Sequence, residues 1–190
     1  MDYPQIRRGQ MKIARNILFV AFLFLLIGFG LASPFENIHT VTNGVVYRSA
    51  QLSRNALIRL IEKHDIKSIF NLRGASTGSD WYNEEIRVSQ RMGVIHYDMD
   101  LSAAKKVSPE RLKEIIALIG NAPKPILIHC NGGADRTGLV CAAWKLTAEH
   151  EPPASARCQL SIIFGHFPHL FWRESIAMDA SFEAFATATR

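Results

Sequence analysis

The sequence predicts an α/β fold in which a central, mainly parallel sheet is flanked by helices, with one N-terminal membrane helix before this domain. The first observation is the alternation of short apolar runs with helical patterns over residues 45–185, which is typical of parallel strands joined by crossover helices. The second is a cysteine-containing, glycine-rich segment at residues 129–138, between an apolar run and a helical pattern. The third is an uncharged apolar run near the N-terminus.

Composition divides the chain into three parts. Residues 1–16 form a basic tail, residues 17–35 form a transmembrane anchor or signal segment, and residues 36–190 form the folded domain. A length of 190 residues fits one domain of ordinary size with an additional segment. The hydrophobic content of 48% is high enough to build a buried core.

The apolar run over residues 17–32 contains no charged side chain, and four basic residues precede it. Such a run is either a cleaved secretory signal or an uncleaved anchor. Residues 33–35 extend it into the length of roughly 17–25 residues that spans a bilayer, and the sequence offers a poor cleavage site, so we favour the anchor. The basic tail then stays in the cytoplasm. In a bacterium the domain would be periplasmic and attached to the inner membrane, or secreted if the segment were cleaved.

The formal net charge is +5, from 22 basic and 17 acidic side chains. The first sixteen residues hold four of the basic and one of the acidic residues, so the remainder carries 18 and 16 and a net charge of +2. A domain this close to neutrality gives no indication of nucleic-acid binding. The cysteines at positions 130, 141 and 158 form no CxxC pair, so they predict neither a zinc site nor a dense disulfide framework.

The first half of the domain predicts strand, helix, strand, helix. Val45–Arg48 is a short strand candidate, and Ser53 can cap the helix after it, in which apolar side chains recur with helical spacing. A second apolar run ends in a loop of small residues, where Ser79 or Asp80 can cap the next helix. The expected ranges are a polar linker at 36–44, strands at 45–48 and 66–72, and helices at 53–64 and 81–92.

The second half predicts strand, helix, strand and three further helices. Tyr97, Met99 and Leu101 alternate with two aspartates, as in a strand. Ser108 followed by proline is a favoured helix start, with a cap and then proline at the first helical position. Two consecutive prolines end the long helix that follows Arg136. The expected ranges are strands at 94–101 and 125–129, helices that begin at Pro109 and after Arg136, and helices at 154–167 and 174–185.

Residues 129–138, which read HCNGGADRTG, are the most informative segment. A tight loop between a strand and a helix N-terminus directs consecutive N–H groups towards one point and so creates an anion site. Cys130 lies in this positive field, which favours its thiolate form, and a thiolate beside a bound phosphoryl group can attack phosphorus. Cys130 is therefore the candidate nucleophile. A buried structural cysteine would require neither the adjacent glycines nor Arg136.

Arg136 is the candidate for binding the phosphoryl oxygens, because a guanidinium matches their geometry better than an ammonium group does. The hydroxyl of Thr137 either caps the helix or donates to the sulfur of Cys130. His129 is expected to orient the loop, since its side chain points to the opposite side of the strand from Cys130. The residues expected to bind substrate are Asn131, Gly132, Gly133, Ala134, Thr137 and Gly138.

The leaving group needs a proton, and three aspartates compete as its donor. Asp135 lies inside the anion loop, where an acidic residue is electrostatically costly. A neighbouring phosphate dianion favours the protonated form of Asp135, which is the form that a general acid needs. Asp98 and Asp100 lie near the end of the strand at 94–101, at the same edge of the sheet. We expect Asp135 to be the general acid, followed by Asp98 and Asp100.

The pattern CxxGxxRT from Cys130 to Thr137 resembles the signature of cysteine-dependent protein tyrosine and dual-specificity phosphatases. Blocks at residues 46–51, 71–74, 81–82 and 101–103 are similar to the compact bacterial dual-specificity-like phosphatases, so the resemblance covers the body of the domain. It implies a protein tyrosine phosphatase-like fold and hydrolysis through a phosphocysteine intermediate, with no metal and no cofactor.

The resemblance also bears on the aspartates. In a subset of the family an aspartate precedes the arginine, as Asp135 does here, and that aspartate has been suspected as the acid. Many relatives have proline where Asp100 stands, so the resemblance assigns no role to Asp100. Asp98 fits the family pattern better.

We therefore expect residues 36–190 to be a phosphomonoester hydrolase acting on phosphotyrosine or phosphoserine/threonine proteins. The alternatives are a phosphatase of a phospholipid or small phosphoester, a membrane-tethered phosphate-binding module without catalysis, and a rhodanese-like sulfurtransferase. The loop contains no lysine, which disfavours highly anionic inositol phosphates, whereas a membrane anchor would favour a lipid. The expected partners are a phosphorylated substrate and, through the N-terminal helix, a membrane. The sequence leaves open the oligomeric state and any disulfide to Cys141 or Cys158.

Overall fold

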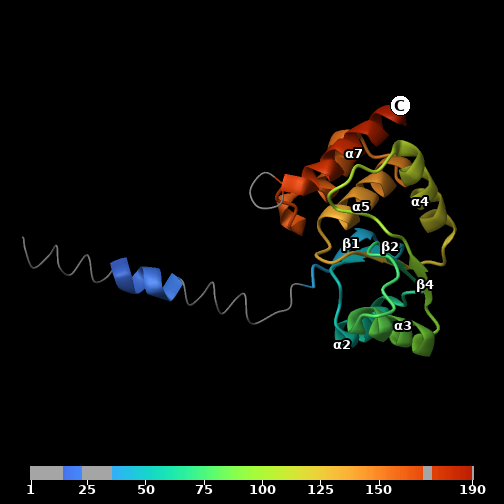
Figure 1. Cartoon of the computed structure of the whole chain (residues 1–190), viewed down its shortest axis with the longest axis horizontal. Coiled ribbons are helices and arrows are strands. Elements are labelled where there is room, and N and C mark those ends of the chain that lie inside the picture. The colour runs from blue at the N-terminus through green and yellow to red at the C-terminus, as the bar shows by residue number, and fades with distance from the viewer. Residues whose placement is uncertain (1–14, 23–35, 169–172, 190) are drawn as a thin grey trace, which may run out of the picture. The chain divides into compact units, whose positions relative to one another are not determined.

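A computed structural model of the chain describes residues 15–22, 36–168 and 173–189. It contains two compact units, Met1–Phe35 and Glu36–Arg190. In the first unit, residues 15–22 are helical (Figure 1). Most of the expected membrane segment, residues 23–35, lies outside the described residues. Among the residues that are described, no helix is both long enough and apolar enough to cross a membrane.

The second unit is built on a five-stranded sheet with the strand order β1-β2-β5-β3-β4. Strands β2, β5, β3 and β4 run parallel to one another, and only β1 is antiparallel to its neighbour β2. The predicted α/β fold with a mainly parallel sheet is therefore confirmed, and β5 lies in the middle of it. The strands are β1 (His39–Thr42), β2 (Val46–Ser49), β3 (Ser68–Asn71), β4 (Ile95–Asp98) and β5 (Ile126–His129).

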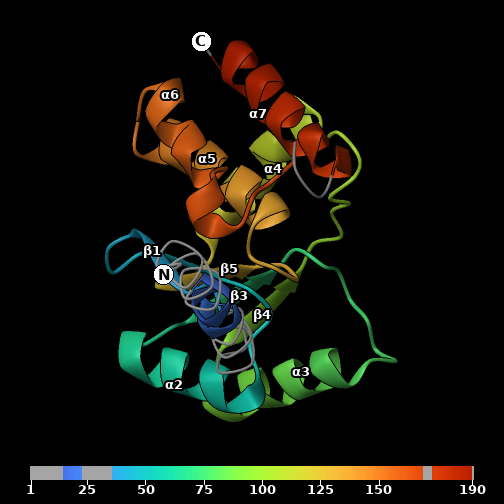
Figure 2. The ribbon, with the colours of Figure 1, turned by 90° about the vertical axis from the view of Figure 1, so that its left-hand side faces the viewer.

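Helices cover both faces of the sheet (Figure 2). One face carries α2 (Arg54–His64) and α3 (Asp80–Met92), and the other carries the remaining helices. Ser53 caps α2 by accepting a hydrogen bond from the backbone N–H of Ala56, as the sequence predicted. The helices on the second face are α4 (Pro109–Asn121), α5 (Asp135–Ala148), α6 (Pro153–Ala156) and α7 (Ile176–Ala188).

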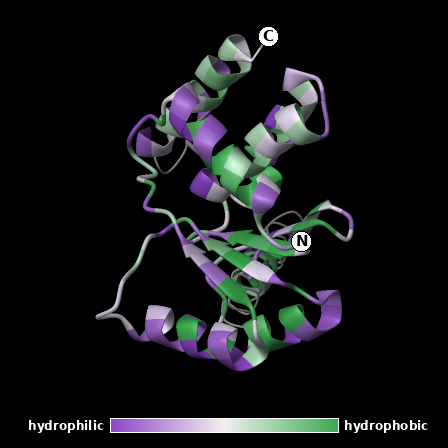
Figure 3. Ribbon diagram, turned by 90° about the vertical axis from the view of Figure 1, so that its right-hand side faces the viewer, coloured by the Kyte–Doolittle hydropathy of each residue, from purple (hydrophilic) through white to green (hydrophobic). Residues whose placement is uncertain are grey.

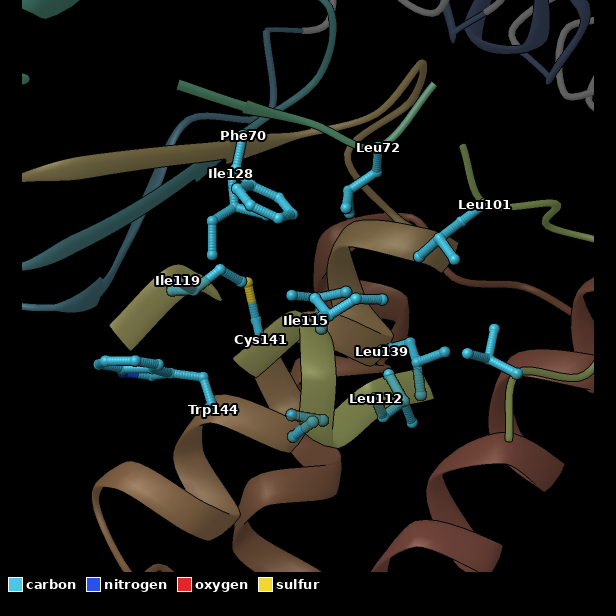
Figure 4. Close-up of a cluster of buried hydrophobic side chains, with 14 of the residues drawn as sticks. Phe70, Leu72, Leu101, Leu112, Ile115, Ile119, Ile128, Leu139, Cys141 and Trp144 are labelled. Atoms are coloured by element: carbon cyan, nitrogen blue, oxygen red, sulfur yellow. The ribbon is translucent and has the colours of Figure 1, made fainter. Parts of the chain in front are cut away.

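The two faces of the sheet bury separate apolar clusters. Successive strand residues point to opposite faces, so Phe70 and Ile128 enter the cluster under α4, α5 and α7 (Figure 4), while Ile69 and Leu127 enter the cluster under α2 and α3. Strands β3 and β5 are buried on both faces, which explains why they read as apolar runs. Figure 3 shows mostly apolar residues in the sheet and both polar and apolar residues on the helices.

Two predicted ranges are wrong. The supposed polar linker at 36–44 contains β1, which forms a hairpin with β2 through the turn at Asn43 and Gly44. An edge strand of four residues carries too little apolar alternation to be recognised. The supposed helix at 154–167 ends after α6, and the 3₁₀ turns η1 (Arg157–Gln159) and η2 (Ile162–Phe164) follow. Gln159 and Phe164 of these turns contact the guanidinium of Arg48 on β2.

Candidate active site

The loop after β5 occupies the centre of the sheet edge. β5 ends at His129 and α5 begins at Asp135, so residues 130–134 connect a central strand to a helix N-terminus. Cys130 is 3% exposed. The parallel strands direct their carboxyl ends to this edge, which is where open α/β sheets bind ligands.

Four consecutive carbonyl groups of the loop accept hydrogen bonds from its surroundings. The pairs are Gln51 N with Asn131 O (2.9 Å), Asn37 Nδ2 with Gly132 O (2.9 Å), Arg48 Nη2 with Gly133 O (2.7 Å) and Gly138 N with Ala134 O (2.9 Å). In a planar trans peptide the C=O and N–H groups point in opposite directions, so the N–H groups that follow face the loop centre. Within the described residues none of the N–H groups of residues 132–134 donates a hydrogen bond. This arrangement is an anion cradle.

Gly133 allows the loop to approach strand β2. Its φ angle is +67°, and a Cβ atom built there would lie 2.6 Å from the backbone of Ser49 and Ala50. Both facts exclude a side chain, because a positive φ strains an L-residue and backbone atoms cannot move aside. Gly132 differs, since a Cβ atom there meets nothing within 4 Å.

We expect Gly133→Ala to lower the free energy of unfolding by about 3 kcal/mol. For a domain of this size, that loss corresponds to a fall in Tm of roughly 6–12 °C. Thermal unfolding followed by circular dichroism measures the change. The matched control, Gly132→Ala, should change the free energy of unfolding by less than about 1 kcal/mol. Equal losses in both variants would show that the contact with Ser49 is not the cause.

Arg48 on β2 supports the loop through a hydrogen bond to its backbone. This residue was not identified from the sequence as part of the site. Its side chain is fully buried; Nη2 donates to Gly133 O, and Nη1 donates to Gln159 Oε1 at 2.8 Å. Its guanidinium lies 4.0 Å from the centre of the Phe164 ring. Burial lowers the pKa of Arg48, although Cys141 and Cys130 oppose this effect. A charged residue inside an otherwise buried strand was the available signal, because such a residue needs partners.

Arg136 is placed beside the cradle by two backbone carbonyls. Its Nη1 donates to Leu72 O at 3.3 Å and to Leu101 O at 3.2 Å, which anchors the guanidinium at the ends of β3 and β4. Thr137 is fully buried, and its hydroxyl has no hydrogen-bond partner in the described part of the chain. Neither of the two bonds considered for Thr137 is therefore formed, and this hydroxyl remains available as a donor.

Asp135 is paired with His166, a residue that the sequence did not single out. His166 Nδ1 lies 2.6 Å from Asp135 Oδ1, and His166 Nε2 lies 3.0 Å from Asp179 Oδ2. Burial lowers the pKa of His166, but the hydrogen bonds and charges of Asp135 and Asp179 outweigh it and raise this pKa to about 9. The N-terminus of α5 is thereby connected to α7 through one imidazole.

The His166 pair predicts a stability that depends on pH. A histidine pKa raised from 6.5 to about 9 stabilises the folded chain fully below about pH 6.5, and this contribution disappears as the pH rises through about 9. Its size is on the order of 2 kcal/mol after allowance for solvent screening. Urea unfolding between pH 6 and pH 10 should show this loss in the wild type and not in His166→Gln. If the free energy of unfolding depended on pH in the same way in the wild type and in His166→Gln, the result would contradict a raised pKa of His166.

Asp98 lies at the end of β4, and β3 separates it from β5. Both of its carboxylate oxygens accept hydrogen bonds, from Asn71 Nδ2 at 2.8 Å and from the Tyr82 hydroxyl at 2.6 Å. The bond to Asp98 and burial raise the pKa of Tyr82 to about 12. Asp100 is exposed and lies against Gly74. Of the three aspartates, Asp135 adjoins the loop of Cys130 along the chain, whereas Asp98 is the last residue of β4 and Asp100 follows that strand.

A second guanidinium, that of Arg73, lies near the site. It stacks on Trp81 at 3.5 Å from the ring centre, and its Nη1 donates to Gln51 Oε1 at 3.0 Å. Burial and the charge of Arg136 lower the pKa of Arg73. The order Leu72-Arg73-Gly74 after a buried strand was the only sequence signal for this residue.

One group of described residues presents several possible metal ligands. Glu85, His96 and His129 hold their ligand atoms within 4.8 Å of one another. Hydrogen bonds between these side chains already account for the arrangement, because Glu85 Oε1 lies between the two Nε2 atoms. The cysteines are free, with Cys130 and Cys141 buried and Cys158 exposed. Burial raises the pKa of the Cys141 thiol to about 11.

Comparison with known folds agrees with this geometry. The structure of TpbA from P. aeruginosa superposes with a TM-score of 0.61 at 17% identity, covering 82% of this chain and 92% of that chain. The core catalytic domain of the PP-IP phosphatase SIW14 from S. cerevisiae gives a TM-score of 0.60 at 22% identity, covering 83% of this chain and 94% of that one. The structure of Tk-PTP gives a TM-score of 0.58 at 17% identity, covering 77% of this chain and 97% of that chain. These similarities establish the fold.

The family follows from the sequence. None of the curated proteins matches the chain significantly. Residues 31–163, well over half of the chain, match the family model PTP-NADK, described as DSP-PTPase phosphatase fused to NAD+ Kinase. That range contains the complete loop of Cys130 and Arg136. The chain therefore belongs to the DSP-PTPase family of cysteine-dependent phosphatases.

Proposed function

We propose that this phosphatase removes phosphate from phosphotyrosine or phosphoserine/threonine side chains of proteins through a phosphocysteine intermediate. The observation that carries the proposal is the cradle of backbone N–H groups in the loop that follows Cys130, which have no acceptor among the described residues, with Arg136 anchored beside it. A Cys-to-Ser variant of TpbA has been crystallised with pTyr, and SIW14 is a PP-IP phosphatase. The loop of this chain has no lysine and contains Asp135, which favours the less anionic phosphoester.

In the first step the thiolate of Cys130 attacks phosphorus. The S–P bond forms as the bond between phosphorus and the leaving oxygen breaks, and the leaving oxygen takes a proton from the general acid. The N–H groups of residues 132–134 and the guanidinium of Arg136 bind the three remaining phosphoryl oxygens, where charge is concentrated in the transition state.

In the second step a water molecule attacks the phosphocysteine. The water loses its proton to the carboxylate left by the first step, the S–P bond breaks, and inorganic phosphate is released. The leaving group is now the thiolate of Cys130. The buried hydroxyl of Thr137 has no partner within the described residues, so it is free to donate to this sulfur.

We assign the proton transfer to Asp135. His166 holds only Oδ1 of this side chain, and within the described residues Oδ2 makes no hydrogen bond. Both oxygens of Asp98 are already engaged. Asp135 is the first residue of α5, directly after the loop and next to Arg136, so it can act as the acid without movement of another strand. The protonated His166 favours the carboxylate form of Asp135, and the bound phosphate dianion has to oppose this charge for the proton to be donated.

Asp135→Asn should lower kcat on alkyl and phenyl phosphates by roughly 10²-fold or more, since general acid catalysis contributes about 10²–10⁴-fold. The loss should be small for an aryl phosphate with a very acidic leaving group, which departs without a proton. The alkaline limb of the kcat/KM profile should disappear in Asp135→Asn and remain in Asp98→Asn. The opposite pattern in these two variants would assign the proton to Asp98.

A substrate panel on the full-length chain tests the proposed substrate class. Phosphate release is compared for a phosphotyrosine peptide, a phosphoserine/threonine peptide and vesicles that contain a phosphoinositide, and thiosulfate is tested with cyanide as acceptor. The peptides should be hydrolysed with the highest kcat/KM. Preference for the vesicles would support a lipid phosphatase, and thiosulfate turnover would support a sulfurtransferase. Phosphate binding without turnover would support a binding module.

We further propose that residues 17–35 attach the protein to the inner membrane and that the phosphatase domain lies in the periplasm. The support is the uncharged apolar run preceded by the basic tail at residues 1–16. A reporter fused after Arg190 tests this topology. Activity of a reporter that works only in the periplasm is the expected result, and activity of one that works only in the cytoplasm would contradict it.

A further inference from the structure

A buried carboxylate lies behind the nucleophile loop. Glu85 of α3 is 3% exposed, and its Oε1 lies 3.0 Å from Nε2 of His129 and 2.8 Å from Nε2 of His96. Its Oε2 accepts a hydrogen bond from Gln51 Nε2 at 2.6 Å. His129 is 1% exposed and immediately precedes Cys130. One carboxylate on the helical layer thus reaches the residue next to the nucleophile.

The second nitrogen of the His129 ring also faces an acceptor. Nδ1 lies 3.4 Å from the carbonyl oxygen of Cys130, which can only accept a hydrogen bond. A neutral imidazole has one donor and one acceptor nitrogen, so one of these two contacts would be repulsive. Only the doubly protonated ring donates at both positions. The hydrogen-bond geometry therefore favours an imidazolium at His129 that is paired with the carboxylate of Glu85.

The charges around this pair are consistent with an ionised Glu85. Burial raises its pKa, but the charge of His129 and the hydrogen bonds from His129 and His96 outweigh this effect and hold the pKa far below its usual range. The other ionisable groups that face the pair are Tyr82 on α3 itself and, from two further elements, Arg73 after β3 and His96 and Asp98 on β4. Arg73 interacts with both Glu85 and Cys130, so it adds a second positive charge to this side of the loop.

We propose that Glu85 is a positioning residue that holds His129 as an imidazolium, and that this cation supports the thiolate of Cys130. The inference rests on the proposed phosphocysteine chemistry, because only a thiolate nucleophile needs such support. Glu85 touches neither the substrate nor the reacting atoms. It acts through His129, the residue that links β5 to the loop.

Replacement of Glu85 makes the Cys130 thiolate easier to form, harder to form or neither. The direction of this change separates the proposed role from that of a nearby charge or a packing residue. If Glu85 acted only as a nearby negative charge, its removal would make the Cys130 thiolate easier to form, because like charges repel. If Glu85 served only to pack α3 against the sheet, its isosteric replacement would leave ionisation of Cys130 unchanged. If Glu85 holds the imidazolium, its replacement removes the neighbouring cation, and the thiolate becomes harder to form.

The experiment compares Glu85→Gln with Glu84→Gln in the full-length chain. Glu84 precedes Glu85 on α3, but its side chain pairs at the surface with Arg54 and Arg87. The rate of alkylation of Cys130 by iodoacetamide is measured against pH with site-resolved mass spectrometry, since the exposed Cys158 also reacts. In Glu85→Gln the midpoint of the profile should rise by roughly one pH unit, and Glu84→Gln should match the wild type. An unchanged or lowered midpoint in Glu85→Gln would overturn the proposal.

A second measurement is made on the wild-type chain and does not require Glu85→Gln to fold. Nitrogen NMR of the wild-type imidazoles, assigned with His129→Asn, should show His129 protonated at both ring nitrogens at neutral pH. A neutral ring would overturn the proposal. Neither readout requires phosphate turnover. A chain that hydrolyses no phosphoester would therefore contradict the proposed function while these two results still decide the role of Glu85.

Discussion

Replacement of Cys130 by serine is expected to abolish phosphomonoester hydrolysis, with a fall in kcat on the order of 10⁴-fold or more. The hydroxyl of serine stays protonated where a thiol becomes a thiolate, so the strong anionic nucleophile is replaced by a weak neutral one. Binding should survive, because the cradle consists of backbone N–H groups and the anchored Arg136, none of which the substitution changes. The variant should therefore retain the affinity of the wild type for inorganic phosphate.

Hydrolysis of para-nitrophenyl phosphate and phosphate binding by calorimetry measure these two effects separately. Cys158→Ser is the matched control, since Cys158 is exposed and the one hydrogen bond of its sulfur within the described residues goes to Ala154 O, at 3.6 Å. It should retain the activity of the wild type. Hydrolysis by Cys130→Ser at more than about one hundredth of the wild-type rate would show that another group attacks phosphorus. Because Cys130→Ser binds without turnover, it is also the form suited to trapping the physiological substrate.

Arg136→Lys is expected to lower kcat/KM by roughly 10²–10³-fold, the range found when one donor to a transition-state oxygen is removed. Lysine retains the charge but loses the planar fork that binds two phosphoryl oxygens at once. It also loses the fixed position that Nη1 has between Leu72 O and Leu101 O. Most of the loss should appear in kcat, because charge on these oxygens is greatest in the transition state.

Steady-state kinetics on an aryl phosphate provides the measurement, with Arg111→Lys as control. Arg111 lies on α4 and pairs with Glu114 at the surface, at 2.8 Å, so its replacement should leave both kinetic constants unchanged. A rise in KM at constant kcat in Arg136→Lys would indicate that the guanidinium binds substrate and transition state equally well. That result would contradict the assigned role.

The alternation of strands and helices was readable from the sequence because the central strands are buried on both faces, whereas α2, α3 and α4 are buried on one face and show apolar residues at helical spacing. The loop of Cys130 was readable for a related reason. Its cradle is formed by consecutive peptide groups between a strand and a helix, so the residues that build it are neighbours in the chain. The two regions in which the structure differs from the predicted ranges are also local. Strand β1 has one edge without a partner, and the segment after α6 turns at Gly165, where φ is +83°.

The sequence by itself determined the α/β fold and the position of the loop after the central strand, and it singled out Cys130 and Arg136 as the candidates for catalysis. Only the tertiary structure showed what holds that loop: Arg48, which is 85 residues from Gly133, Glu85, which is 44 residues from His129, and His166, which is 31 residues from Asp135. These partners meet because strand order and helix packing bring distant side chains together. The spacing of residues along the chain does not predict such a contact, since a buried charged side chain can pair with a residue from any element that packs against it.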